Sequence, residues 1–246
     1  MIELKNGFHL HHGNCLETTT RMPNKSIDLI ITDPPYGDSY KSCYQNYDNR
    51  GTIPVRIERE DYFQEIEGDE EVPTEYLIEC YRLLKDASAI YIFCKWNKWH
   101  ILFPAVEQAG FKIKNMIVMN KNNHGMGDLK GSYAPKHELV MFATKGKHIL
   151  RYKMRPKDVI RAKVLYSGSR RLHPNQKPVE WIIPFILHSS DESDTILDLY
   201  MGSGTTGEAC VNTARNFVGI EKEKKYFDIA VKRIRKAQMQ PLLFQP

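Results

Sequence analysis

The sequence predicts an α/β fold in which helices cover a mostly parallel β-sheet. Short apolar segments rich in β-branched residues alternate along the chain with segments of helical period. Two of the apolar segments, 26–32 and 195–200, run directly into turns rich in proline or glycine, and open α/β sheets bind ligands at such strand ends. The length of 246 residues suits one α/β domain with a modest insertion, so we expect one domain over 1–246.

Each expected element rests on a local pattern. The segment 26–32, SIDLIIT, is expected to form a buried strand that a proline turn stops. Residues 74–85 place apolar side chains at i, i+3, i+4 and i+7, which is typical of an amphipathic helix. Further strands are expected at 89–94, 111–119, 138–144, 195–200 and 217–220, and further helices at 101–109, 178–190, 205–213 and 225–238.

The stretch of roughly 120–172 breaks this alternation and is rich in basic residues. We interpret it as an insertion within the domain rather than as a second domain. Its part from 145 to 171 contains ten Lys or Arg residues and one acid, a density that can neutralise nucleic-acid phosphates. A solvated surface is the alternative. The candidate DNA-binding residues are Lys145, Lys147, Arg151, Lys153, Arg155, Lys157, Arg161, Lys163, Arg170 and Arg171.

The composition limits the cellular context. Five cysteines are scattered without a CxxC pair, so we expect neither disulfides nor a zinc site, and no other metal is expected. The N-terminus lacks the apolar core of a signal peptide, and no apolar run is long enough to cross a bilayer. A reducing, cytoplasmic location without membrane contact fits these features. Residues 37–60 lack periodicity and are expected to form a mobile loop.

A glycine-rich turn follows the expected strand at 195–200. The sequence from Asp198 to Gly207 is DLYMGSGTTG, and it leads into a helix. Glycines let the backbone turn tightly and approach a ligand, and the helix N-terminus suits an anionic group. The next strand ends at Glu221, where a dinucleotide-type fold places the carboxylate that holds a ribose diol. We predict a nucleoside-type ligand here; a structural turn with a surface glutamate is the alternative.

The sequence Asp33-Pro34-Pro35-Tyr36 follows the strand 26–32 directly. The two prolines stiffen the backbone, so the turn can aim the Pro34 carbonyl and the Asp33 carboxylate outward together. These two acceptors suit the two hydrogens of an aromatic amine, and Tyr36 offers a face on which a base can stack. A base reaches such a pocket only after it leaves the duplex stack. A plain surface turn is the alternative.

A third motif, HPNQKP at 173–178, precedes the expected helix at 178–190. It places Lys177 at a helix start, which is unfavourable for the helix dipole unless the lysine meets an anion. An exposed loop is the alternative interpretation of this segment.

Together these motifs resemble the DNA amino-methyltransferases of bacteria and phages, in the order typical of their β class. The resemblance covers roughly residues 8–235. It implies a Rossmann-like methyltransferase fold that depends on S-adenosyl-L-methionine, with one antiparallel strand and a permuted motif order. It also implies site-specific methylation of double-stranded DNA by direct in-line attack of a flipped-out base. As to assembly, the sequence leaves a homodimer open.

The resemblance assigns a role to each motif. Asp33, Pro34, Pro35 and Tyr36 would hold and activate the target amine. The glycine turn and the HPNQKP loop would enclose the methionine end of the cofactor, and Glu221 would bind its ribose. The implied cofactor-binding residues are Asn14, Cys15, Asp33, His173, Gln176, Lys177, Pro178, Asp198, Tyr200, Gly202, Ser203, Gly204, Thr205, Thr206 and Glu221.

Two positions depart from the family pattern. Asn14 stands where aspartate is usual, and Asp198-Leu199-Tyr200 stands where Asp-Pro-Phe is usual. Within the family, aspartate at position 33 favours adenine N6, whereas serine is commoner in cytosine N4 enzymes, so we expect an adenine-specific enzyme. The alternatives are cytosine N4 methylation, methylation of RNA or protein amides, and a catalytically silent regulator that binds S-adenosylmethionine or DNA.

Overall fold

The computed structural model describes residues 1–36, 45–47, 54–56, 72–123, 130–163 and 176–239. The chain forms two compact units, one made of Met1–Pro34 with Thr74–Pro246 and the other of Pro35–Pro73. The described part of the second unit contains a short antiparallel pair, β4 (Gln45–Tyr47) and β5 (Pro54–Arg56). The segment 37–60 was predicted to be a loop, and the structure corrects this prediction at these two strands. The other residues of the segment lie outside the described ones.

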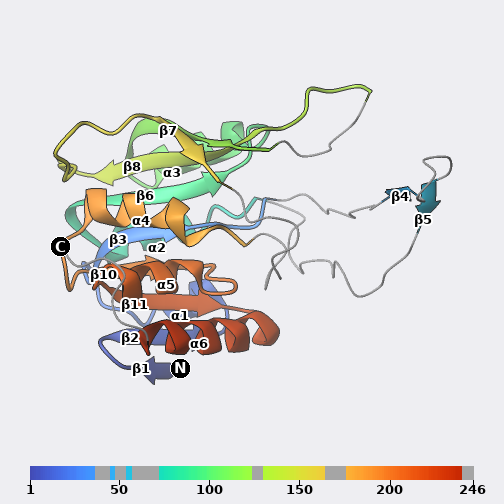
Figure 1. The fold of residues 1–246 in the computed structure, drawn as a ribbon. Coiled ribbons are helices and arrows are strands. Elements are labelled where there is room, and N and C mark those ends of the chain that lie inside the picture. The colour runs from blue at the N-terminus through green and yellow to red at the C-terminus, as the bar shows by residue number, and fades with distance from the viewer. Residues whose placement is uncertain (37–44, 48–53, 57–71, 124–129, 164–175, 240–246) are drawn as a thin grey trace. The chain divides into compact units, whose positions relative to one another are not determined.

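The first unit is built on a nine-stranded sheet (Figure 1). β8 runs antiparallel to both of its neighbours and β1 runs antiparallel to β2, whereas the other neighbouring strands are parallel. The predicted mostly parallel sheet is confirmed, with β8 as an antiparallel strand inside it and β1 as a second one at its edge. The order is β1 (Ile2–Leu4), β2 (Phe8–His12), β11 (Asn216–Glu221), β10 (Thr195–Asp198), β3 (Ile27–Thr32), β6 (Leu84–Cys94), β8 (His137–Lys145), β7 (Lys112–Lys121) and β9 (Val159–Ala162).

Helices cover both faces of this sheet (Figure 1). Successive side chains of a strand point to opposite faces, so in β6 Tyr91 and Phe93 join one hydrophobic core while Ile90 and Ile92 join the other. Among the described residues, none of the helices has the length and apolar character needed to span a membrane. α4 (Val179–Ser189), α5 (Thr205–Asn212) and α6 (Lys224–Gln238) pack on the first core, and α1 (Cys15–Thr19), α2 (Tyr76–Leu83) and α3 (Trp99–Gln108) pack on the second.

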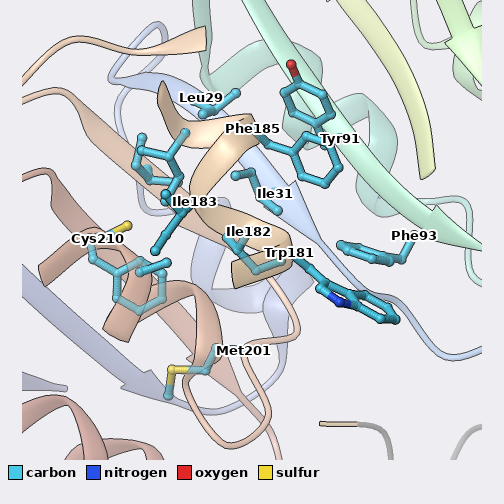
Figure 2. Close-up of a cluster of buried hydrophobic side chains, with 14 of the residues drawn as sticks. Leu29, Ile31, Tyr91, Phe93, Trp181, Ile182, Ile183, Phe185, Met201 and Cys210 are labelled. Atoms are coloured by element: carbon cyan, nitrogen blue, oxygen red, sulfur yellow. The ribbon is translucent and has the colours of Figure 1, made fainter. Parts of the chain in front are cut away.

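An aromatic cluster anchors α4 to the sheet, as Figure 2 shows. Phe185 stacks on Tyr91 with ring centroids 4.6 Å apart. Trp181 is also buried, and its indole N–H donates to the Lys163 carbonyl at 2.7 Å. Truncation of a buried phenylalanine typically costs about 3–5 kcal/mol. These contacts hold the start of α4, and with it the preceding Lys177, in a fixed place on the sheet.

The boundaries of several predicted elements change in the structure. β1, β2, α1 and β9 were not predicted, and β6 begins at Leu84, inside the predicted helix 74–85, because α2 ends at Leu83. The stretch interpreted as an insertion, 120–172, contains the strand predicted at 138–144, observed as β8, and the unpredicted strand β9. β8 lies within the sheet between β6 and β7, and β9 pairs with β7. Two parts of that stretch therefore belong to the sheet itself.

Candidate active site

The predicted motifs meet at one edge of the sheet. β2, β11, β10 and β3 are parallel neighbours, so their carboxyl ends lie at the same edge. Asp33 follows β3, the glycine turn follows β10, and Glu221 ends β11. After β2, the Gly13 N–H donates to the Glu221 carbonyl at 2.9 Å. Residues from motifs far apart in the sequence thus form one candidate site.

The turn between β10 and α5 has a backbone that favours glycine. Gly202 has a φ of 52° and Gly204 a φ of 82°, and both values lie in the left-handed region that most residues avoid. A Cβ on Gly204 would lie 3.0 Å from the Cβ of Ala230 in α6. Gly204 is also the N-cap of α5 and provides no capping side chain. The turn therefore presents the end of α5 that attracts anions.

Asp198 links the two ends of this turn. Its buried carboxylate accepts hydrogen bonds from the Thr206 hydroxyl at 2.6 Å and from the Tyr200 N–H at 3.1 Å. Burial raises the pKa of Asp198 to about 7, and the nearby Asp33 charge adds to the rise while the two hydrogen bonds oppose it. Asp198 thus fixes the shape of the glycine turn from inside the protein.

The Glu221 carboxylate lies partly buried at the end of β11. Its Oε2 accepts from the Gly202 N–H at 2.9 Å and its Oε1 from the Glu223 N–H at 2.8 Å. Burial raises the pKa of Glu221, and the backbone hydrogen bonds oppose this shift. Because a carboxylate offers about four acceptor positions, Glu221 keeps capacity to accept a hydrogen bond from a ligand.

Lys177 connects the turn after β3 with the glycine turn. Its ammonium lies 2.7 Å from Asp33 Oδ2 and 3.2 Å from Glu138 Oε2, and it sits over the Phe93 ring, 5.1 Å from the centroid. Its carbonyl accepts a hydrogen bond from the Thr205 hydroxyl at 3.2 Å. The two carboxylates compensate a cation at a helix start, where the helix dipole disfavours it.

Sequence reasoning missed three residues at this edge. Glu138 reaches it because β8 runs antiparallel and begins here, and Lys121 Nζ lies 3.8 Å from Glu138 Oε1. Arg233 of α6 donates to the Thr205 hydroxyl at 3.0 Å and to the Ser203 hydroxyl at 3.3 Å. Only the direction of β8 could have indicated Glu138. No local pattern distinguishes Arg233 from the other basic residues of its helix.

Asn14 orders the segment after β2. Its side-chain oxygen accepts from the Leu16 N–H at 2.8 Å and caps α1. Aspartate would accept the same bond, so this departure from the family pattern keeps the cap. Cys15 is buried close to Tyr200, whose ring meets Tyr76 edge to face with centroids 5.5 Å apart. Tyr200 therefore packs edge to face on Tyr76 at the position where the resemblance predicts phenylalanine.

The remaining motif residues lie at the borders of the first unit. Pro34 ends its first segment, whereas Pro35 and Tyr36 begin the second unit. Pro178 is the N-cap of α4, and Gln176 is the first described residue before Lys177. The predicted residues that lie outside the described ones are His173, Arg170 and Arg171.

Lys145 lies in the protein interior rather than at a DNA-facing surface. Its ammonium donates to the carbonyls of Tyr81 and Leu84 at 2.6 and 2.8 Å, and the residue is buried. In the register of β6 and β8, Lys145 lies opposite Ser88, at the sheet edge away from Asp33. This placement corrects its assignment as a DNA contact, because an amine that is bonded to two buried carbonyls does not reach a phosphate.

The other members of the predicted DNA-binding block are divided between the two sheet edges. Arg151 pairs with Asp191 at 2.7 Å, and together with Lys147 it follows β8 at the edge opposite the candidate site. β9 runs parallel to β7, and both strands end at the sheet edge where β8 begins, which is the edge of the candidate site. Arg161 and Lys163, near the end of β9, are exposed at this edge. The remaining described members of the block, Lys153, Arg155 and Lys157, lie between these two groups in the sequence and are exposed.

Comparison with known proteins assigns the family. The chain matches the DNA methylase family of N6/N4 methyltransferases over residues 27–232. The chain belongs to this family. This methylase is 29% identical over 249 residues to the type II methyltransferase M.HinfI of Haemophilus influenzae, covering 93% of this chain and 68% of that protein. It is 29% identical over 246 residues to the type II methyltransferase M2.DpnII of Streptococcus pneumoniae, covering 94% and 90%.

Solved structures share its fold. The complex of M1.HpyAVI with SAM has a TM-score of 0.68 and 27% identity, and the match covers 92% of this methylase and 98% of that chain. The cytosine-N4-specific PvuII DNA methyltransferase has a TM-score of 0.69 at 15% identity, with 91% and 85% covered. The family and the Rossmann-like methyltransferase fold implied by the sequence motifs are therefore confirmed.

Proposed function

We propose that this methylase transfers the methyl group of S-adenosyl-L-methionine to N6 of adenine at specific sites in double-stranded DNA. One observation carries the proposal: the Asp33 carboxylate, held by Lys177, lies at the same sheet edge as the glycine turn and Glu221. An amine bound at Asp33 would thus lie close to a donor bound at the turn. Family membership supports a DNA substrate, and the type II names of two relatives support site-specific modification.

The donor side fits S-adenosyl-L-methionine. Glu221 keeps acceptor capacity for the ribose hydroxyls, and the N-terminus of α5 behind the glycine turn suits the methionine carboxylate. Asn14, Cys15 and Tyr200 would line the adenine side. The cofactor supplies a methyl group that is already activated on a sulfonium. The protein therefore contributes mainly position and electrostatics.

The acceptor side suits an exocyclic amine. Asp33 would accept one amine hydrogen and the Pro34 carbonyl the other, which draws the nitrogen lone pair out of conjugation. Lys177 keeps the carboxylate in one orientation, because its ammonium bridges Asp33 and Glu138. The amine loses one proton on methylation, and Asp33 is the base that we assign to receive it. Tyr36 belongs to the second unit, and its stacking on the flipped-out base stays a prediction.

The test is an analysis of methylated nucleosides. We expect the purified chain, with S-adenosylmethionine and duplex DNA from a methylation-free host, to produce N6-methyladenine. Formation of N4-methylcytosine instead would show that cytosine, and not adenine, is the base that is methylated. Parallel reactions with tRNA and with protein test the alternative substrates.

The Asp33→Ala variant tests the mechanism. We expect methyl transfer to fall by at least about 10²-fold, a larger loss than any loss of cofactor affinity, although the resemblance also places Asp33 at the cofactor. Transfer near the wild-type rate would contradict the role of Asp33. A wild-type chain that binds the cofactor and DNA but transfers no methyl group would indicate a silent regulator instead.

A further inference from the structure

We propose that residues 95–99 form a second DNA-contact surface, in which Trp96 and Trp99 stack on nucleobases next to the target site. The proposal rests on the proposed function. The segment, KWNKW, connects β6 to α3. It lies outside the basic block from which the sequence analysis predicted DNA binding.

The segment follows directly from the candidate active site. β6 pairs in parallel with β3, so the residues after β6 and Asp33 emerge at the same sheet edge. The last residues of β6 contact the site: Phe93 lies under the Lys177 ammonium. Burial raises the pKa of the Cys94 thiol to about 12, with a smaller contribution from the Asp33 charge. Trp96 comes two residues after Cys94.

Both tryptophans are exposed although they are large and mostly apolar. The exposed fraction is 68% for Trp96 and 45% for Trp99, against 3% for Trp181. The segment is an ordered turn, since the Lys98 N–H donates to the Lys95 carbonyl at 3.1 Å and Trp99 begins α3. Exposed aromatic area on a fixed turn is unfavourable in water, and a partner that stacks on it removes this cost.

The charge of the segment identifies the partner as nucleic acid. Lys95 and Lys98 alternate with the tryptophans, and no acid occurs before Glu107. Exposed Arg161 and Lys163 lie at the same edge. Aromatic faces beside positive charges bind bases and phosphates in nucleic-acid-binding proteins, whereas a second copy docked through the same surface would bring like charges together.

Base flipping gives the tryptophans a specific task. Extrusion of a base toward Asp33 leaves the neighbouring bases without a stacking partner. DNA whose target base occupies the site must pass over this sheet edge, where Trp96 and Trp99 are exposed. An indole ring can replace the missing stacking partner, and the lysines can contact the flanking phosphates.

Tryptophan fluorescence tests the stacking without a loss of the surface. The Trp99→Phe variant retains two tryptophans, the exposed Trp96 and the buried Trp181. We expect duplex DNA from a methylation-free host to quench the emission of this variant. The matched variant Trp96→Phe/Trp99→Phe, which retains Trp181 alone, should keep its emission. Unchanged emission of Trp99→Phe at saturating DNA would contradict the stacking.

Binding measurements provide the second test. We expect Trp96→Ala to weaken DNA affinity by roughly five- to hundredfold. The double variant Lys95→Ala/Lys98→Ala should lower the slope of log affinity against log salt by about 0.9 for each phosphate that the lysines no longer neutralise. The control is Leu187→Ala, an apolar residue 41% exposed in the last turn of α4, and it should bind DNA like the wild type.

The outcomes separate this inference from the proposed function. If the wild type methylates DNA and Trp96→Ala binds DNA with wild-type affinity, only the stacking surface is disproved. If the wild type methylates no DNA, the proposed function fails. If sedimentation shows that Trp96→Ala converts a dimer to a monomer while DNA affinity stays unchanged, the surface covers a second copy and the inference is overturned.

Discussion

The two sides of the candidate site are built by different means. On the donor side, backbone geometry dominates: Gly202 and Gly204 have positive φ values, and the Gly202 N–H holds Glu221. On the acceptor side, Asp33 and Lys177 are held by charged side chains from separate segments. Damage to the donor side should therefore disturb local folding and cofactor binding together. Damage to the acceptor side should lower the reaction rate while the fold persists.

The largest effect is expected for Gly204→Val. Valine at position 204 would have to adopt a φ of 82°, and its Cβ would lie 3.0 Å from the Cβ of Ala230. The free energy of unfolding should therefore fall by about 2–4 kcal/mol. Calorimetry should show S-adenosylmethionine affinity reduced by at least about tenfold, because the turn itself shifts. Gly146→Val is the matched control: its φ is 73°, its nearest neighbour is 3.5 Å away, and it follows β8. Equal cofactor affinity in both variants would refute the backbone-built donor side.

Lys177→Ala should have the next largest effect. Loss of the ammonium removes the group that orients Asp33, so we expect kcat to fall by about 10²-fold. The Lys177 carbonyl still accepts the Thr205 hydrogen bond, so cofactor affinity should change much less. Lys121→Ala, whose ammonium lies 3.8 Å from Glu138, should lower kcat less than tenfold. Steady-state kinetics measure the loss of kcat, and cofactor titration measures the change in cofactor affinity. A loss confined to cofactor affinity would show that Lys177 acts on the donor side.

Asp198 makes the stability of the donor side depend on pH. Its folded pKa of about 7 lies above the ordinary value of 3.8, so the folded state binds more protons between these values. The free energy of unfolding of the wild type, relative to Asp198→Asn, should therefore fall as pH rises from about 4 to about 7, by an amount on the order of 2–4 kcal/mol. Denaturant unfolding at several pH values measures this difference. A difference that does not change with pH across this range would show that burial does not raise the pKa of Asp198.

The smallest effect is expected for Glu138→Gln. The amide keeps the shape of the side chain but loses the charge that faces Lys177, 3.2 Å away, so kcat should fall by roughly three- to tenfold. KM for DNA and cofactor affinity should stay unchanged, because Glu138 acts through Lys177. Glu180→Gln, an exposed residue in the first turn of α4, serves as the control. Equal rates for the two variants would mean that the position of Lys177 does not depend on Glu138.

Local patterns predicted most elements of the first unit, because amphipathic periods and turn residues act over a few neighbouring positions. The predicted segments 26–32, 101–109 and 178–190 correspond to β3, α3 and α4 within a few residues. The short strands β1 and β9 escaped prediction. Each lies at an edge of the sheet and is defined mainly by pairing with its one neighbouring strand.

By itself the sequence determined which residues follow the parallel strands: Asp33, the glycine turn and Glu221 were placed at strand ends, and parallel strands bring such ends to one edge. Only the tertiary structure decided which charges meet there. Glu138 lies at the start of β8, next to its first residue, and Lys145 ends the strand, so the antiparallel direction brings the first to Lys177 and buries the second at the opposite edge. That direction depends on pairing with β6 and β7, strands from other parts of the chain, and no local pattern of side chains encodes it.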